Sequence, residues 1–320
     1  MIRTNVWEET AQMKSGRGVW PVMITPFTED MKIDYNGVEK IIQWYDRLGV
    51  TGIFAVCQSS EMFELNAQER LELGKFVIDH TPKHIEVVVS GHVAEKPEDQ
   101  VREAQAMIDA GAGTYVFISN QFAKPDESED VAKKNIEYLI DHIDAPAFGV
   151  YECPYPYKRV ISPELLRWMA DTGKFSFLKD TCCDPVMLKA KADAVKGTGL
   201  KIYNANGATL LDSLRNGCAG YSGVMCNFFP DLIVWLVDQF DEQPELAEEM
   251  QDFIGAASTI ECQVYPCNSK YYLQLEGLPI TTKSRKQDDA LMTASRKMEI
   301  VQYRNVVQRF REYFFKKAGR

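Results

Sequence analysis

Two residues at the ends of predicted β-strands could together do carbonyl chemistry. Lys179 ends the run Phe175-Ser176-Phe177-Leu178-Lys179, and alternation along a strand puts it on the same face as the two phenylalanines. If that face is an apolar interior, desolvation lowers the pKa of the lysine toward the neutral amine that attacks carbonyls and forms a Schiff base. Tyr151 ends another run, and a phenol there can relay protons because its oxygen both donates and accepts.

A third candidate is the serine pair Ser59-Ser60, in a turn after another predicted strand. Hydroxyls and backbone N–H groups of such a turn can hold a carboxylate. Each feature also has a purely structural interpretation. The lysine could leave the strand for solvent or pair with an acid, and the tyrosine could be a core residue with its hydroxyl at the rim.

The elements that must position these residues are short β-branched runs, each followed by a longer amphipathic stretch. Eight such units are the number that closes a parallel barrel, and the G-x-G-x-x-G fingerprint of an open dinucleotide-binding sheet is absent after the first strand. The sequence therefore predicts an α/β fold, a (β/α)8 TIM barrel with a C-terminal helical appendage. The predicted strands are Val19–Thr25, Ile53–Cys57, Ile85–Val89, Thr114–Ile118, Ala147–Tyr151, Phe175–Lys179, Lys201–Asn204 and Gly220–Met225.

The strand and helix rhythm stops after about Phe240. We expect an N-terminal extension over 1–17, the barrel with the catalytic site over 18–240, and a helical region over 241–320. The last amphipathic helix is predicted to end near Phe315 and to pack on the barrel or on a neighbouring subunit.

The charge balance narrows the classes of partner. The 320 residues include 36 Lys and Arg against 46 Asp and Glu, a net charge of −10, which argues against nucleic-acid and anionic-membrane binding. No apolar run approaches the roughly 18 residues that span a bilayer. The first 15 residues hold no apolar stretch of signal-peptide length. We therefore expect a cytoplasmic protein whose partner is a small molecule.

Cysteine and histidine placement bears on metal binding. The 8 cysteines lack CxxC spacing and fit reduced thiols, and most strand-end cysteines are small buried hydrophobes. A metal site would be expected to recruit histidine, and only His92, after the third strand, could approach the barrel mouth. We predict no metal and no bound cofactor. The cysteines that could converge on the mouth are Cys57, Cys153, Cys182, Cys183 and Cys226.

Several motifs occur together in a defined order. They are Pro21-Val22-Met23-Ile24-Thr25-Pro26-Phe27, the turn ending in Ser59-Ser60-Glu61, Tyr151-x-x-Pro154 and Phe177-Leu178-Lys179-Asp180. In order and approximate spacing they resemble the dihydrodipicolinate synthase and N-acetylneuraminate lyase family. The resemblance covers roughly residues 18–230 and extends to the tail through Lys270-Tyr271-Tyr272-Leu273-x-x-x-Gly277.

The resemblance implies a class I aldolase or dehydratase on a (β/α)8 barrel, usually a homotetramer, that works without a metal. In the family the lysine matched by Lys179 forms an imine with a 2-oxo acid, often pyruvate, and the tyrosine matched by Tyr151 is the proton relay. The turn matched by Ser59 and Ser60 holds the substrate carboxylate, and Ser222 matches a residue that lines the same pocket.

The departures from the family pattern concern the second substrate of dihydrodipicolinate synthase. The family turn Gly-Thr-Thr-Gly-Glu or Gly-Ser-Thr-Gly-Glu is replaced at its first four positions by Cys-Gln-Ser-Ser at 57–60. Phe122 stands where the synthase has a second tyrosine, and Pro156 where it has an arginine that grips the second carboxylate. Lys158 or Arg159 could compensate from nearby. We therefore expect a family member that is not a dihydrodipicolinate synthase.

The leading hypothesis is a Schiff-base lyase that acts through Lys179 on a pyruvate-like 2-oxo acid or a 2-oxo sugar acid, by aldol cleavage or by dehydration. The second hypothesis is a barrel of the same family that has lost turnover and serves as a small-acid binding or regulatory protein. Retention of Lys179, Tyr151 and the serine pair favours the enzyme. A metal-dependent barrel lyase is disfavoured because histidine and carboxylate ligands are scarce at strand ends.

Overall fold

The computed structural model describes residues 16–319. The N-terminal extension predicted over 1–17 therefore lies outside the described residues, apart from Gly16 and Arg17. Within the described range, no helix combines the length and the apolar character needed to cross a membrane.

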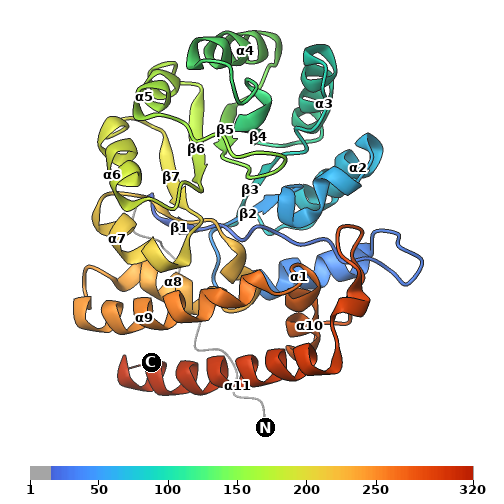
Figure 1. Cartoon of the computed structure of the whole chain (residues 1–320), viewed down its shortest axis with the longest axis vertical. Helices are drawn as coiled ribbons and strands as arrows, with labels where there is room; N and C mark the ends of the chain where they lie inside the picture. The colour runs from blue at the N-terminus through green and yellow to red at the C-terminus, as the bar shows by residue number, and fades with distance from the viewer. Residues whose placement is uncertain (1–15, 320) are drawn as a thin grey trace.

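Eight parallel strands form one sheet in the order β1-β8-β7-β6-β5-β4-β3-β2, inside a ring of helices (Figure 1). Between β1 and β2 the ring is closed by backbone hydrogen bonds from Phe54 N to Pro21 O (2.9 Å) and from Met23 N to Phe54 O (3.0 Å). The predicted (β/α)8 barrel is confirmed. The strands are β1 (Gly18–Val19), β2 (Gly52–Ala55), β3 (Glu86–Val89), β4 (Thr114–Ile118), β5 (Ala147–Tyr151), β6 (Phe175–Asp180), β7 (Lys201–Asn204) and β8 (Gly220–Tyr221).

The first and last strands are shorter than the sequence predicted, because β1 does not reach Thr25 and β8 does not reach Met225. Pro21 has no N–H to extend the ladder, and the 3₁₀ turn Val224–Asn227 begins three residues after β8 ends. The two strands approach closely where they pair. A Cβ placed on Gly220 would lie 1.8 Å from the carbonyl oxygen of Gly18, so this pairing requires glycine.

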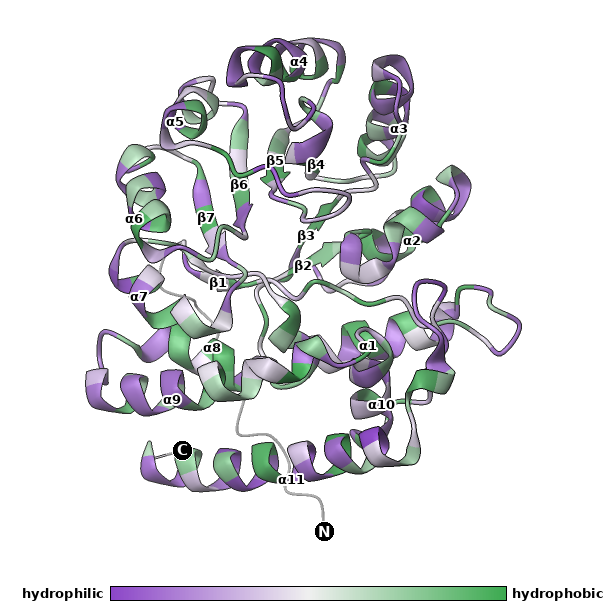
Figure 2. Ribbon diagram, viewed as in Figure 1, coloured by the Kyte–Doolittle hydropathy of each residue, from purple (hydrophilic) through white to green (hydrophobic). Residues whose placement is uncertain are grey.

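The helices of the barrel turn their apolar faces toward the strands and their polar faces outward (Figure 2). Two begin with strong caps. Asn66 and Glu69 form a reciprocal capping box at α2, and Ser162 accepts from Leu165 N ahead of a proline at the first helical position of α5. The helices are α1 (Tyr35–Arg47), α2 (Ala67–His80), α3 (Pro97–Asp109), α4 (Glu129–His142), α5 (Pro163–Asp171), α6 (Pro185–Ala194), α7 (Leu210–Arg215) and α8 (Pro230–Gln239).

The C-terminal helices pack on one side of the barrel, beside α8 and α1 (Figure 1). The ring centroids of Trp235 on α8 and Phe314 on α11 are 4.6 Å apart, and Arg311 binds Asp231 at 2.6 Å. The region therefore shares a core with the last barrel unit. Its elements are α9 (Pro244–Ala257), the 3₁₀ turn Ser258–Cys262, α10 (Cys267–Leu275), the 3₁₀ turn Asp289–Leu291 and α11 (Ala294–Lys317).

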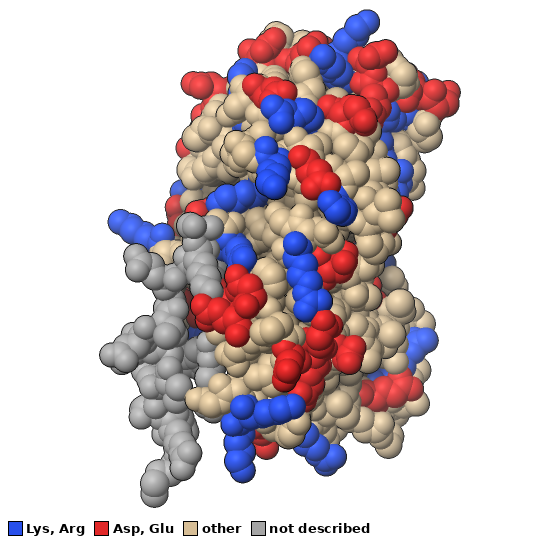
Figure 3. Space-filling model, turned by 90° about the vertical axis from the view of Figure 1, so that its left-hand side faces the viewer, with Lys and Arg blue, Asp and Glu red and all other residues tan. Residues whose placement is uncertain are grey.

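Charges are mixed over one side of the molecule. On the face shown in Figure 3, acidic and basic side chains lie interspersed, with no broad field of one sign. That distribution lacks the basic stripe expected of a nucleic-acid binder.

Candidate active site

Lys179 and Tyr151 meet at the carboxyl end of the barrel. They are register partners in the β5–β6 ladder, and Lys179 Nζ lies 4.0 Å from the centre of the Tyr151 ring. The ring of Phe54 lies 5.8 Å from the same nitrogen. Only 5% of Lys179 and 3% of Tyr151 is exposed. The predicted strand alternation therefore does place the amine over an apolar, aromatic barrel interior.

This environment sets the protonation of both groups. Burial lowers the pKa of the Lys179 amine, while weaker interactions with Cys57, Cys153 and Glu261 act in the opposite direction. Burial raises the pKa of the Tyr151 phenol well above its ordinary value. A buried lysine of this kind has a larger neutral fraction near pH 7 than a solvated one, and the tyrosine is a protonated phenol able to donate.

The turn after β2 brings a glutamine to Tyr151. The Tyr151 hydroxyl donates to Gln58 Oε1 at 2.9 Å, and the Cys153 thiol donates to the same oxygen at 3.8 Å. Sequence reasoning noted Gln58 only as a departure from a family pattern. Its contact with Tyr151 joins residues 93 positions apart in the chain.

The three predicted substrate-binding serines have different surroundings. The Ser60 hydroxyl donates to Met23 O at 2.6 Å and accepts from Cys57 N at 3.1 Å, so it stabilises the turn itself. The Ser59 side chain lies near Tyr265 and acts to lower the pKa of its phenol. Ser222 follows β8, and its Oγ is buried without a hydrogen-bond partner among the described residues. Ser59 and Ser222 therefore have hydroxyls that a ligand at the mouth could engage.

Ser222→Ala is expected to leave the free energy of unfolding unchanged or to raise it by about 1 kcal/mol, because the wild-type hydroxyl is buried without a partner. The same substitution should weaken pyruvate binding several-fold if the hydroxyl serves the ligand. Urea unfolding and a pyruvate titration measure the two quantities. A variant that is clearly less stable, with unchanged pyruvate affinity, would show that Ser222 has a structural role.

The C-terminal region also contributes to the mouth. The Tyr265 hydroxyl accepts from Asn227 Nδ2 at 3.2 Å and lies near Ser59, which acts to lower its pKa. Burial raises the pKa of the Glu261 carboxyl, and the charge of Lys179 acts to lower it. From the sequence we expected only a helical region here, whose last helix packs on the barrel or on a neighbouring subunit. No local motif marks either residue as part of the site, because each acts through contacts distant in the chain.

A buried ion pair ties the tail to the serine turn. Lys270 Nζ lies 2.8 Å from Glu61 Oε1, and both side chains are fully buried. The other carboxylate oxygen accepts from Ser284 Oγ, Arg285 N and Lys286 N at 2.7 to 2.9 Å. Glu61 has a left-handed backbone with φ of 62°, a conformation that the surrounding contacts must maintain.

A second buried cluster lies directly behind Lys179 and Tyr151. Glu152 and Asp180 directly follow Tyr151 and Lys179 in the chain and, by alternation, point to the opposite side. Lys191 on α6 reaches both carboxylates at 2.5 Å, and all three side chains are fully buried. Lys191 therefore joins the ends of β5 and β6.

The residues considered as substitutes for the family arginine are bound elsewhere. Lys158 donates to Thr181 O at 2.7 Å, and Arg159 donates to the carbonyls of Lys124 and Glu127. Each cation thus binds backbone carbonyls in this structure.

His92, the histidine considered for a metal, is part of the packing. Its Nδ1 accepts from Ile118 N at 3.1 Å, so its Nε2–H donates to Gln100 Oε1 at 3.0 Å. Burial lowers the pKa of His92 to about 4, which keeps the ring neutral. Among residues 16–319 no three His, Cys, Asp or Glu side chains are grouped to hold a metal ion. The 8 cysteines are unpaired, and Cys57, Cys153 and Cys226 interact with Lys179.

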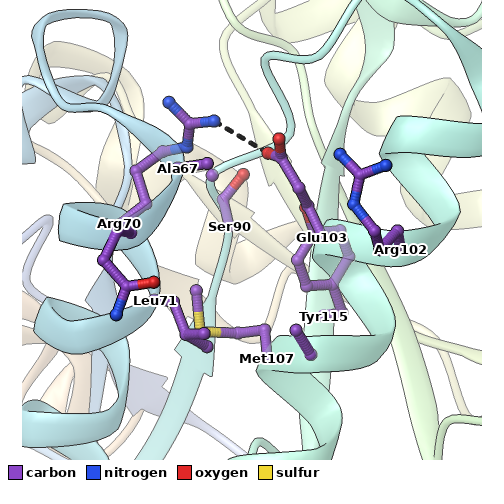
Figure 4. A pocket seen from close by; sticks show the side chains of 11 residues that line it. Ala67, Arg70, Leu71, Ser90, Arg102, Glu103, Met107 and Tyr115 are labelled. Carbon is purple, nitrogen blue, oxygen red and sulfur yellow. Dashed lines mark hydrogen bonds and ion pairs between the residues drawn. The ribbon is translucent and has the colours of Figure 1, made fainter.

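One cavity of about 210 Å³ lies between α2 and α3, away from Lys179. Figure 4 shows Arg70 and Glu103 facing each other across it, joined by a 2.7 Å ion pair. Ser90 and Tyr115 also line it, and none of its lining residues contributes to the Lys179 site. The cavity is therefore separate from the Lys179 site.

A sequence model of the dihydrodipicolinate synthetase family matches residues 15–297 of this chain. The chain belongs to this family. The resemblance predicted from its motifs is thereby confirmed, and the match extends from the barrel into the C-terminal helices.

Individual family members are distant. The 4-hydroxy-tetrahydrodipicolinate synthase of Cellvibrio japonicus (strain Ueda107) is 23% identical over 264 residues, 82% of this chain and 86% of the relative. YagE of Escherichia coli (strain K12), provisionally named a 2-dehydro-3-deoxy-D-gluconate aldolase, is 26% identical over 226 residues, 69% and 72% of the two chains. The crystal structure of YagE in complex with pyruvate has a TM-score of 0.81 at 22% identity, covering 93% of this chain and 99% of YagE.

Proposed function

We propose that this protein is a Schiff-base-forming lyase that acts through Lys179 on a pyruvate-like 2-oxo acid or a 2-oxo sugar acid. The observation that carries the proposal is the buried amine of Lys179, 4.0 Å from the Tyr151 ring centre at the mouth of the barrel. Membership of the dihydrodipicolinate synthetase family and the likeness to YagE, whose crystal structure holds pyruvate, support it.

The first step is imine formation. The neutral Nζ of Lys179 attacks the C2 carbonyl carbon of the 2-oxo acid, and the resulting carbinolamine loses its oxygen as water. Tyr151 supplies the proton for the leaving hydroxyl and takes back the proton that the nitrogen releases. The hydroxyls of Ser59 and Ser222 would hold the carboxylate. No metal or other cofactor takes part in this scheme.

The imine then serves as an electron sink. In aldol cleavage the C3–C4 electron pair forms the C2=C3 bond of the enamine, and the π pair of the imine moves to the nitrogen. The proton of the C4 hydroxyl passes through Tyr151 to that nitrogen, and an aldehyde departs. In dehydration a hydroxylated sugar acid loses a proton and a hydroxyl, which leave as water. Protonation of the enamine carbon and addition of water to the imine then release the product and regenerate Lys179.

Borohydride trapping tests the proposal directly. The protein is reduced with pyruvate and, separately, with longer 2-oxo sugar acids, and its peptides are analysed by mass spectrometry. We expect an adduct on the peptide that contains Lys179. The absence of an adduct with every acid would contradict the imine. An adduct without turnover of any acid would favour the second hypothesis, a small-acid binding protein.

Tyr151→Phe is expected to lower kcat by about 10² to 10⁴ while substrate affinity changes little. The ring packing is retained and only the proton-carrying hydroxyl is lost. Steady-state kinetics separate the two effects. Unchanged turnover would remove the relay role of Tyr151.

Assembly and location are also proposed from the family resemblance, as a homotetramer in the cytoplasm. Sedimentation at micromolar concentration tests the assembly. A monomer under those conditions would contradict it.

A further inference from the structure

Gln58 offers a hydrogen-bond donor at the site that no residue within 16–319 uses. Its carbonyl oxygen Oε1 is occupied by the hydroxyl of Tyr151 and the thiol of Cys153. Its Nε2 has no hydrogen-bond partner within residues 16–319, and the side chain is only half-buried at the barrel mouth. The amide thus faces the relay tyrosine with one end and has two free N–H groups at the other.

The position of this amide relative to the chemistry follows from Tyr151. The tyrosine must reach the reacting carbons to move protons, and Gln58 Oε1 lies 2.9 Å from its hydroxyl. The free end of the amide is therefore beside the bond that is made or broken. An amide neither gains nor loses a proton near neutral pH. Gln58 can therefore bind and orient a substrate atom, but it cannot transfer a proton to or from Tyr151.

The surrounding charges indicate which kind of atom it binds. Lys158 and Arg159 donate to backbone carbonyls, and the carboxyl of Glu261 is within electrostatic range of Lys179. A carboxylate at the far end of a substrate would lie near the Glu261 carboxyl, while Lys158 and Arg159 are already bound to backbone carbonyls. An uncharged, hydroxylated chain suits a neutral amide donor and a carboxyl acceptor.

We propose that Gln58 Nε2 donates to the oxygen on C4 of a 2-oxo-3-deoxy acid, the first oxygen beyond the keto group. This inference rests on the proposed function. The oxygen accepts the bond both as the hydroxyl of the intact acid and as the carbonyl oxygen of the aldehyde, so the contact persists through cleavage. Gln58 thereby selects hydroxylated 2-oxo acids over unsubstituted ones.

A matched pair of acids measures this selection. 2-Oxobutanoate and 4-hydroxy-2-oxobutanoate differ only in the C4 hydroxyl, and borohydride trapping gives the half-saturating concentration of each. Adducts are identified by mass. Cleavage of the hydroxylated acid leaves a pyruvate adduct, so that adduct is counted as trapping of the hydroxylated acid. The wild-type protein is expected to prefer the hydroxylated acid about tenfold, the effect of one hydrogen bond.

Gln58→Glu is the diagnostic variant, because it keeps a carboxyl oxygen for the Tyr151 hydroxyl and removes both N–H donors. Its added negative charge acts on imine formation with both acids, so the ratio of the two half-saturating concentrations isolates the lost donor. We expect this ratio to fall from about ten to about one. Gln239→Glu is the matched control, since Gln239 on α8 also accepts a hydrogen bond through Oε1, from Gln243 at 3.2 Å.

The outcomes are distinct. A wild-type ratio near one, or a ratio that Gln58→Glu leaves unchanged, would overturn the role of Gln58 while leaving the imine in place. Trapping of neither acid by the wild-type protein would overturn the proposed function itself. A ratio lost in Gln58→Glu and retained in Gln239→Glu would support the inference.

Discussion

Lys179→Met is expected to abolish imine trapping and to lower kcat/KM by about 10⁴-fold or more, because the nucleophile is removed and no nearby amine replaces it. Lys191, the other buried lysine beside these strands, is bound to two carboxylates. Trapping yield and steady-state kinetics measure the loss. Lys196→Met, which removes an exposed lysine, is the control and should behave as the wild type.

The same variant should gain stability. Burial lowers the pKa of Lys179 in the folded state, so the folded protein binds this proton less tightly than the unfolded chain does. The resulting loss in the free energy of unfolding is fully present below the folded pKa of Lys179. It disappears as pH rises toward the unfolded value of about 10.4. Replacing Lys179 with methionine should therefore raise the free energy of unfolding by about 1 kcal/mol near pH 7, and by less at alkaline pH.

Urea unfolding at neutral and alkaline pH checks this expectation. In the wild-type protein, the rate of imine formation should rise with pH and reach its midpoint below the ordinary lysine pKa of about 10.4. A Lys179→Met variant that is destabilised and still traps pyruvate would contradict both its catalytic role and the account of its burial.

Lys191→Met is expected to lower the free energy of unfolding by about 3 to 5 kcal/mol, the usual cost of leaving buried charges without their partner. Glu152 and Asp180 are fully buried and share this one ammonium group. Glu152 also accepts from Ile161 N and Thr181 N at 2.9 Å, so its displacement would disturb the loops after β5 and β6.

The loss in the free energy of unfolding of Lys191→Met should depend on pH. Burial and the neighbouring Asp180 raise the pKa of Glu152, and Lys191 acts to lower it. Without Lys191 the folded pKa of Glu152 rises further. A raised folded pKa costs stability as pH increases above the unfolded value of about 4.3. The deficit of Lys191→Met relative to the wild type should thus be small near pH 4 and larger near pH 7.

Lys189→Met provides a matched control on the same helix. Lys189 forms an exposed ion pair with Asp193 at 2.6 Å, and such a pair contributes about 0.5 kcal/mol or less. Unfolding followed by circular dichroism at the two pH values compares the variants. Equal losses in the two variants, or a Lys191→Met deficit that does not change with pH, would contradict the account of the buried cluster.

The sequence by itself determined the barrel and the face on which Lys179 lies, because both depend on local patterns. Strand alternation placed Lys179 on the same face as two phenylalanines, and the spacing of βα units predicted that strand ends would meet at one mouth. The lengths of β1 and β8 were wrong, since a periodic apolar run does not show where pairing between distant strands stops.

Only the tertiary structure decided what surrounds that pair. Gln58 and Tyr151 are 93 residues apart in the chain, Glu61 and Lys270 are 209 apart, and Tyr265 enters the mouth from the helical tail. No periodicity or short motif encodes such contacts, because they arise when the closed barrel and the tail bring separate loops together. The placement of Lys179 in the barrel was therefore predictable from local sequence, whereas the groups proposed to select a substrate there were not.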